Sequence, residues 1–171
     1  LRMTKIAAIN EAGVNIISTL DLSRLLKLVA TSACLIMEAE TCIIRLLDPL
    51  TGKYGIRESY GMKTEAEQKD LFLMDKKAVT RILKGEPSLL VRDVPGEKDW
   101  QDFADVARTL ICLPLRGEEE ILGTITIFDK FPHKTFFPSS FTTEDLATFG
   151  KFVRYVEKAV ANAIAYERND R

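Results

Sequence analysis

The sequence has one histidine, three cysteines and no cysteine pair at metal-binding spacing. With His133 alone, neither a Cys/His zinc site nor a helical pair of histidines can be assembled, so we expect no metal site. Cys34, Cys42 and Cys112 are widely spaced and odd in number. This pattern argues against a disulfide framework and favours a reducing compartment, and we therefore expect a cytoplasmic protein.

An excess of charge is also missing. The chain has 24 Lys and Arg against 25 Asp and Glu, which gives a formal net charge of −1. Nucleic-acid binders normally carry a basic excess, so we expect no nucleic-acid partner. No apolar run approaches the ~20 residues of a membrane span and no signal peptide is visible, so we expect no membrane insertion. The sequence opens at Leu1, which favours a segment of a longer protein.

What is present is an ordinary globular composition. The 171 residues are 46% hydrophobic and 29% charged. A chain of this length forms one domain with a sizeable core.

Periodicity predicts helices at both ends. Apolar residues recur every three or four positions over 3–19, and again over 22–38 after Asp21, which is a typical N-cap. A long final helix is predicted from Thr142 or Thr143 to about Arg168.

Strands and turns fill the centre. Residues 41–47 and 54–60 read as a hairpin across a Pro- and Gly-containing turn, and residues 109–115 and 120–129 as a second one. A helix capped by Asp75 and ending at residue 84 is predicted between them, followed by a short strand at 88–91 and a loop with one helical turn at 92–107. The fold class is therefore α+β, with a central antiparallel sheet of five to six strands and segregated helices.

Common catalytic motifs are absent, and no catalytic residue is predicted. There is no dinucleotide-binding glycine motif, no phosphate-binding loop and no nucleophile elbow. His133 reads as an exposed loop histidine. The cysteines read mainly as small buried side chains, and the alternative is a redox-active thiol.

Two segments carry a family resemblance. Residues 109–129 contain an apolar strand ending in Pro114-Leu115, a charged turn, and a restart at Leu122-Gly123. Residues 156–168 carry Ala-x-x-Asn-Ala-x-x-Tyr, from Ala159 to Tyr166. Together with the first hairpin and the helix-ending Gly85-Glu86-Pro87, these features resemble a GAF domain over essentially the whole chain.

The resemblance implies terminal helices on one face of the sheet and a small-molecule pocket on the other, under loops and short helices. Cyclic-nucleotide-binding members have an Asn-Lys…Phe-x-x-x-Asp-Glu motif, which here reads Asp129-Lys130, Phe141 and Asp145-Leu146. Because Asp129 and Leu146 depart from it, cyclic-nucleotide binding is not expected, while a Lys130–Asp145 ion pair is. No cysteine adjoins a histidine, so no covalent chromophore is expected, and no cofactor is identified.

GAF domains act as sensory or regulatory modules in histidine kinases of two-component systems, diguanylate cyclases and transcriptional regulators, and we expect this role here. The final helix has apolar residues at alternating three- and four-residue spacing, which is a heptad seam: Leu146, Phe149, Val153, Val156, Val160 and Ala163. We expect a homodimer through the first and last helices, with the last helix leading to an output domain. The alternatives are that both stripes only cover the sheet, that the chain is a ligand-free dimerisation spacer, or that it is an enzyme similar to free methionine sulfoxide reductases.

The resemblance divides residues 1–171 into an N-terminal signalling helix (1–19), a core (20–141) and a C-terminal helix (142–171). It places candidate ligand contacts at five positions: Tyr60, Asp93, Trp100, Phe103 and Thr109. The aromatic ones are equally well explained by core packing.

Overall fold

The computed structural model describes residues 2–62, 64–131 and 139–169, and side chains from residue 5 onward. Within these ranges five strands form one antiparallel sheet in the order β2-β1-β5-β4-β3. The strands are β1 (Ala39–Leu47), β2 (Tyr54–Tyr60), β3 (Leu89–Val91), β4 (Leu110–Arg116) and β5 (Ile121–Lys130). The helices are α1 (Arg2–Ile17), α2 (Leu22–Met37), α3 (Glu65–Leu83) and α4 (Thr143–Asn169). The predicted α+β class with an antiparallel sheet is confirmed.

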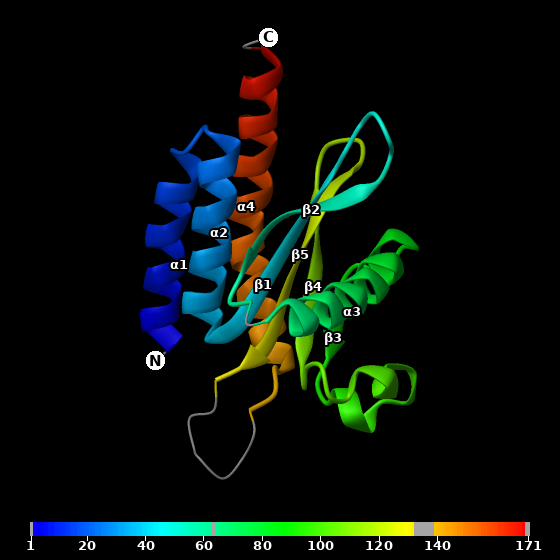
Figure 1. Ribbon diagram of the computed structural model, residues 1–171. Helices are drawn as coiled ribbons and strands as arrows, with labels where there is room; N and C mark the ends of the chain where they lie inside the picture. The colour runs from blue at the N-terminus through cyan, green and yellow to red at the C-terminus, as the bar shows by residue number, and fades with distance from the viewer. Residues whose placement is uncertain (1, 63, 132–138, 170–171) are drawn as a thin grey trace.

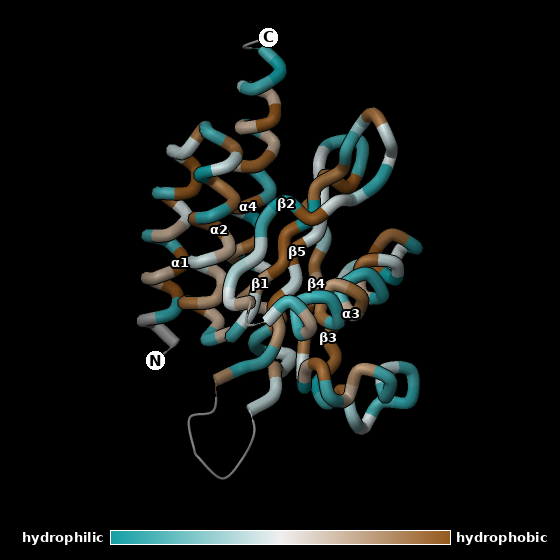
Figure 2. The backbone as a smooth tube through the Cα atoms, in the orientation of Figure 1, coloured by the Kyte–Doolittle hydropathy of each residue, from teal (hydrophilic) through white to brown (hydrophobic). Residues whose placement is uncertain are grey.

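The helices lie on both faces of the sheet. Figure 1 shows α1, α2 and α4 side by side on one face and α3 on the other, with two short 3₁₀ helices, Val94–Gly96 and Lys98–Phe103, beyond the far edge. Hydrophobic residues follow the central strands and the inner sides of the helices, whereas the outer surface is mostly polar (Figure 2). None of the described helices combines the length and the apolar character needed to cross a membrane.

The predicted N-terminal starts of α2 and α4 are explained by local side-chain hydrogen bonds. Asp21 accepts a hydrogen bond from the backbone N–H of Arg24 (3.1 Å) and caps α2. At α4, the Thr142 hydroxyl accepts from the backbone N–H of Asp145 (3.1 Å), and the Thr142 N–H donates to the Asp145 carboxylate (2.9 Å). This reciprocal arrangement satisfies donors that the first helical turn leaves free.

The sequence-based boundary of α3 was wrong. The helix begins at Glu65, ten residues before the predicted start, and Thr64 caps it by accepting from the backbone N–H of Glu67 (3.2 Å). Its first two turns are rich in good helix formers but mostly exposed, so they lack the apolar stripe used to predict helices. Asp75 is not a cap, because it lies mid-helix and is fully buried.

The heptad seam of α4 packs within the chain. Phe149, Val153, Val156, Val160 and Ala163 are all buried, and α4 contacts α1, α2 and β4. The seam is therefore buried against α1, α2 and β4 of the same chain. The expected homodimer through the first and last helices stays a prediction. The predicted histidine loop falls largely in residues 132–138, so His133 lies outside the described residues.

Candidate functional site

The two faces of the sheet differ in chemistry. Cross-strand register places three rows of β1, β5 and β4 residues under α3: Thr41, Phe128 and Leu110; Ile43, Thr126 and Cys112; Arg45, Thr124 and Pro114. The opposite face presents side chains that pack against α1, α2 and α4: Cys42, Ile44, Leu46, Ile111, Leu113, Leu115, Ile125 and Ile127. Polar side chains on the sheet interior are thus confined to the α3 face.

Arg45 joins three elements on this face. Its Nε donates to the Asp75 Oδ2 of α3 at 2.5 Å. Its Nη1 donates to the Tyr54 carbonyl of β2 (3.3 Å) and its Nη2 to the Phe72 carbonyl of α3 (3.2 Å). The pairing of β1 with β2 shifts register between Ile44 and Arg45, at the position where this side chain leaves the strand. The guanidinium therefore ties α3 to the sheet.

The Asp75 carboxylate, which pairs with Arg45, has few groups that stabilise its buried charge. Burial raises the pKa of Asp75 above its usual value, although the Arg45 guanidinium favours the charged form. Within the described part of the chain, Asp75 Oδ1 and the Thr124 hydroxyl are buried without a hydrogen-bond partner. Buried polar atoms without partners cost stability, and they tend to persist where they serve a function.

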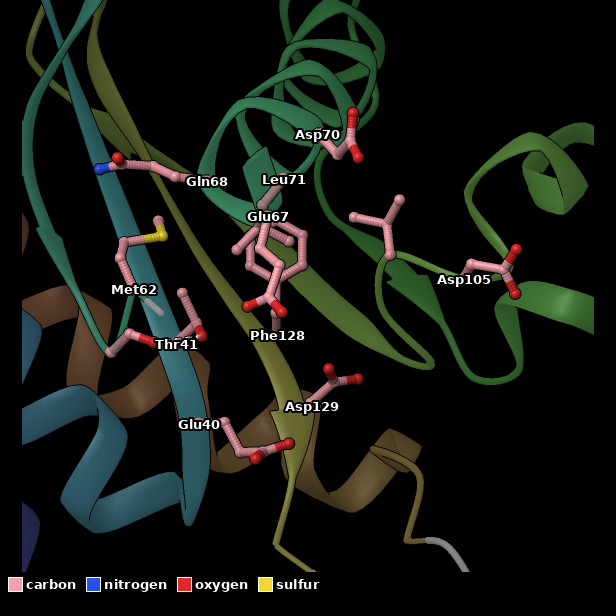
Figure 3. A pocket seen from close by; sticks show the side chains of 12 residues that line it. Glu40, Thr41, Met62, Glu67, Gln68, Asp70, Leu71, Asp105, Phe128 and Asp129 are labelled. Carbon is pink, nitrogen blue, oxygen red and sulfur yellow. Dashed lines mark hydrogen bonds between the residues drawn. The ribbon is translucent and has the colours of Figure 1, made fainter. Parts of the chain in front are cut away.

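An acidic cavity lies between the N-terminal half of α3 and the ends of β1 and β5 (Figure 3). Its volume is about 230 Å³. Apolar side chains and one threonine form part of its wall: Thr41, Met62, Leu71, Val106 and Phe128. Five carboxylates surround it: Glu40, Glu67, Asp70, Asp105 and Asp129. No Lys or Arg of the described residues lines it.

The wall of the acidic cavity is linked to the start of α4. Asp129 has a left-handed backbone (φ 59°), and its Oδ1 accepts from the backbone N–H groups of Arg108 (2.7 Å) and Thr109 (3.3 Å). The next residue, Lys130, donates from Nζ to the Asp145 Oδ2 of α4 at 3.0 Å. Both side chains of this pair are largely buried. The predicted Lys130–Asp145 ion pair is therefore confirmed.

A second, shallow and open hollow, the basic cleft, lies on the other side of α3 and shares Gln68 with the acidic cavity. Its volume is about 470 Å³, and it is lined by Arg45, Glu65, Gln68, Lys69, Phe72, Leu73 and Lys76. Three cations, one of them (Arg45) paired with the buried Asp75, and one anion line this cleft, whereas the acidic cavity has five anions. The two hollows are therefore suited to ligands of opposite charge.

All three cysteines are buried and have no disulfide partner among the described residues. Burial raises the pKa of the Cys34 thiol to about 12 and also raises those of Cys42 and Cys112. The Thr126 hydroxyl donates to the Cys112 sulfur at 3.2 Å. Because the thiolate is the reactive form, these thiols are poor nucleophiles in the folded state.

The five sequence-predicted contacts do not form one cluster. Trp100 is buried, lies 6.2 Å from the Phe103 ring and has the Lys77 Nζ 4.8 Å from its ring centre. Tyr60 is 46% exposed at the end of β2. None of the five lines the acidic cavity or the basic cleft.

The two polar residues among the five predicted ligand contacts, Asp93 and Thr109, lie near β3 and β4. Asp93 is exposed and faces Arg108 at 3.8 Å. Thr109 is buried, donates its hydroxyl to the Val91 carbonyl (2.9 Å) and accepts from the Phe141 N–H (3.1 Å). It supports the cavity wall from behind, since its own N–H is bound by Asp129. As ligand contacts, the five residues stay a prediction.

Sequence reasoning missed the residues that line both hollows and the buried role of Asp75, although two signals were present. Arg45 occupies an α3-facing position between aliphatic neighbours of β1, where alternation alone places a charge in the interior. Asp75 falls on the buried stripe of α3, one residue after Met74 and three before Ala78. The acidic residues carry no such signal, because they come together only through the fold. Among the described residues, no three His, Cys, Asp or Glu side chains converge to hold a metal ion.

Comparison with known proteins identifies the family. The fold is an α+β domain with an antiparallel sheet and two hollows beside one helix. The sequence model of the GAF domain matches residues 21–160, and the chain belongs to this family. Comparison with curated protein sequences gives no significant match.

Solved structures show the same fold. The GAF domain of a phosphoenolpyruvate-protein phosphotransferase from Coxiella burnetii aligns with TM-score 0.72 at 15% identity, covering 97% of this chain and 98% of that one. Free methionine-R-sulfoxide reductase from Neisseria meningitidis, solved with its substrate, gives 0.67 at 13%, with 95% and 91% covered. The GAF domain of a putative sensor histidine kinase from Pseudomonas syringae pv. tomato gives 0.63 at 13%, with 98% and 92% covered.

Proposed function

We propose that this chain is a non-enzymatic regulatory GAF domain of a larger signalling protein, such as a histidine kinase, diguanylate cyclase or transcriptional regulator. In this proposal it binds a small organic cation in the acidic cavity and works as a homodimer. The signal leaves through α4, which extends beyond the body of the domain toward its C-terminal end (Figure 1). Similar folds occur in a sensor histidine kinase and a phosphotransferase, in agreement with a regulatory role.

The observation that carries the proposal is the link between the acidic cavity and α4. Phe128 and Asp129 line the cavity, and the next residue forms the buried ion pair with Asp145 in the first turn of α4. A ligand that moves the end of β5 therefore acts on the start of α4 through a single residue, Lys130. Because this pair is largely buried, it is screened less by salt than a surface pair.

The walls of the cavity define the ligand class. Apolar contacts from Met62, Leu71 and Phe128 fit a carbon skeleton, and the surrounding carboxylates favour positive charge. In Figure 3 the carboxylates of Glu40, Glu67 and Asp129 lie around one end of the cavity, with Asp105 farther off. Charges spread in this way suit an amine or polyamine better than a single metal ion.

Native mass spectrometry of the purified domain, followed by calorimetric titration with amines, polyamines and their neutral analogues, tests this step. We expect cations to bind and neutral analogues not to bind. Glu40→Gln/Glu67→Gln should weaken binding, whereas Glu118→Gln/Glu119→Gln, with the same charge change on the β4–β5 turn, should not. Equal binding of neutral analogues, or equal effects of the two variants, would contradict the assignment.

A groove between α1 and α2 is the proposed dimer surface, in place of the surface of the first and last helices expected from the sequence, because the apolar seam of α4 is buried within the chain. It has a volume of about 430 Å³, includes Leu28, Leu35 and Ile36, and carries charges of both signs at Lys5 and Glu11. Leu35 is 79% exposed and lines this groove together with Leu28 and Ile36. A surface with both signs of charge can pair with itself in a two-fold dimer.

Light scattering at high micromolar concentration tests the dimer. We expect Leu35→Lys to give monomers, whereas Leu50→Lys at the β1–β2 turn, where Leu50 is 94% exposed, should leave dimers intact. A strictly monomeric parent chain would refute this part of the proposal. Dimers without any bound cation would instead favour the ligand-free spacer.

The absence of enzymatic activity rests on the thiols. A reductase of the free methionine sulfoxide type requires reactive cysteines, whereas Cys34, Cys42 and Cys112 are buried with raised pKa values. In a native thiol titration we expect all three to react only after unfolding. Turnover of methionine sulfoxide that is lost in Cys112→Ser would overturn the proposal.

A further inference from the structure

The basic cleft is separate from the acidic cavity and has no part in the function proposed above. It lies beside α3, where β1 passes under the helix, and Arg45 contributes to its lining. The Arg45 side chain is 11% exposed, whereas that of its partner Asp75 is completely covered. The cationic member of this buried pair is thus the one that reaches the cleft.

Arg45 retains hydrogen-bonding capacity. A guanidinium has five N–H donors, and three of them are used: one to the Asp75 carboxylate and two to the carbonyls of Tyr54 and Phe72. The two carbonyl bonds are long, at 3.3 and 3.2 Å. Two N–H donors on the Nη atoms therefore remain for an oxygen anion, which guanidinium groups bind well because of their planar fork.

The surroundings of Arg45 specify the rest of the ligand. Lys69 and Lys76 add positive charge, and Glu65 is the one acidic residue among the described residues that line the cleft. Phe72 and Leu73 supply apolar surface, and Leu73 is 52% exposed although it is a large aliphatic side chain. An apolar surface beside a cationic group matches a ligand with a hydrocarbon body and an anionic head.

The Asp75 carboxylate does not block such a ligand. It is completely covered and engages Nε, whereas each Nη atom donates one bond to a backbone carbonyl, of Tyr54 or Phe72. The Thr124 hydroxyl, directly across the strand pair from Arg45, has no partner in the described part of the chain. The polar groups around the guanidinium are therefore not saturated by the protein.

We propose that the basic cleft is a second ligand site, which binds a small organic anion with an apolar body through Arg45, Lys69 and Lys76. The head group, a carboxylate or a phosphate, accepts from the free Nη donors of Arg45. The hydrocarbon part covers Phe72 and Leu73. The domain thus has one site for a cation and one for an anion, on opposite sides of the same helix.

Calorimetric titration with octanoate and octanol tests the site, because the two probes share the hydrocarbon chain and differ in charge. We expect octanoate to bind about tenfold or more tightly than octanol, as charge-assisted hydrogen bonds require. The octanoate affinity should fall with increasing salt. Equal affinity of the two probes would overturn the proposal.

Matched lysine variants locate the site. Lys76→Gln should weaken octanoate binding about two- to fivefold, as expected for one exposed charge. Lys77→Gln makes the same change one residue later, where the side chain lies over Trp100, and should have no effect. Equal effects of the two variants would show attraction by net charge alone and would refute the site.

The role of Arg45 is tested by Arg45→Met/Asp75→Leu, since removal of both charges avoids an unpaired buried carboxylate. We expect this variant to fold, as judged by circular dichroism, and to lose octanoate binding. Retained binding would overturn the assignment of Arg45. If the variant does not fold, Arg45→Lys serves instead, and unchanged octanoate affinity there would have the same meaning. Binding to vesicles of anionic phospholipid without binding to octanoate would assign the cleft to a membrane surface and refute the proposal.

Discussion

The two faces of the sheet contrast sharply, although helices cover both. Under α1, α2 and α4 the sheet presents apolar residues that pack with three buried or half-buried helical stripes. Under α3 it presents Arg45, Thr124 and Thr126, and α3 returns the buried Asp75. Burial of apolar surface stabilises a fold, whereas buried ionic groups recover at best their own desolvation cost. Both faces bury apolar surface, since Ile43, Met74 and Phe128 belong to a second core cluster under α3. The two faces differ because the α3 face also retains buried polar groups.

The largest effect is expected on the apolar face. Phe152 is fully buried and stacks on Phe149 with ring centres 6.3 Å apart. Phe152→Ala should lower the free energy of unfolding by about 3–5 kcal/mol, because it leaves a cavity. Urea denaturation measures this, with Phe131→Ala as the control, since Phe131 is 52% exposed. A loss similar to that of the control would contradict the division between the faces.

On the α3 face, removal of one member of the Arg45–Asp75 ion pair should lower the free energy of unfolding by nearly as much. Arg45→Met leaves the Asp75 carboxylate buried without its cation, and we expect a loss of about 3 kcal/mol. The same urea experiment measures it. A change below about 0.5 kcal/mol, which is typical of surface positions, would show that Asp75 does not depend on Arg45.

A smaller effect concerns pH. Burial raises the folded-state pKa of Asp75 above its unfolded value, so the folded protein holds this proton more tightly. The resulting stabilisation is complete below the unfolded pKa, near pH 4, and is lost as the pH rises through the folded-state pKa. The unfolding free energy of the parent chain should therefore fall relative to Asp75→Asn as the pH is raised from about 4. An increase instead would mean that Arg45 outweighs burial.

The smallest effect is expected at the acidic cavity. Glu67 is exposed and Glu40 is half-buried, and neither forms a described salt bridge. Glu40→Gln/Glu67→Gln should leave the unfolding transition in urea unchanged within error while it weakens cation binding. A clear destabilisation would show that these carboxylates support the fold rather than a ligand.

Local features could be predicted from the sequence, and most of the hollows could not. Asp21 and Thr142 could be predicted as helix caps, because a cap depends on residues only three positions away. Lys130 and Asp145 were paired through the family resemblance. The local sequence pattern does not predict that Asp75 of α3 contacts Arg45 of β1. It also does not predict that carboxylates from β1, α3 and β5 line one cavity. Both depend on how α3 crosses the sheet, and the true start of α3 was itself hidden by its polar first turns.

The central claim is that the polar groups under α3 are retained for function and not for stability. The unfolding free energy of Arg45→Met/Asp75→Leu, compared with that of the parent chain, tests it most directly. We predict that the double variant is as stable as the parent or more stable, because apolar replacements of a buried ion pair are often neutral or stabilising. A loss comparable to that of Phe152→Ala would contradict the claim and would make the ion pair a structural element of the core.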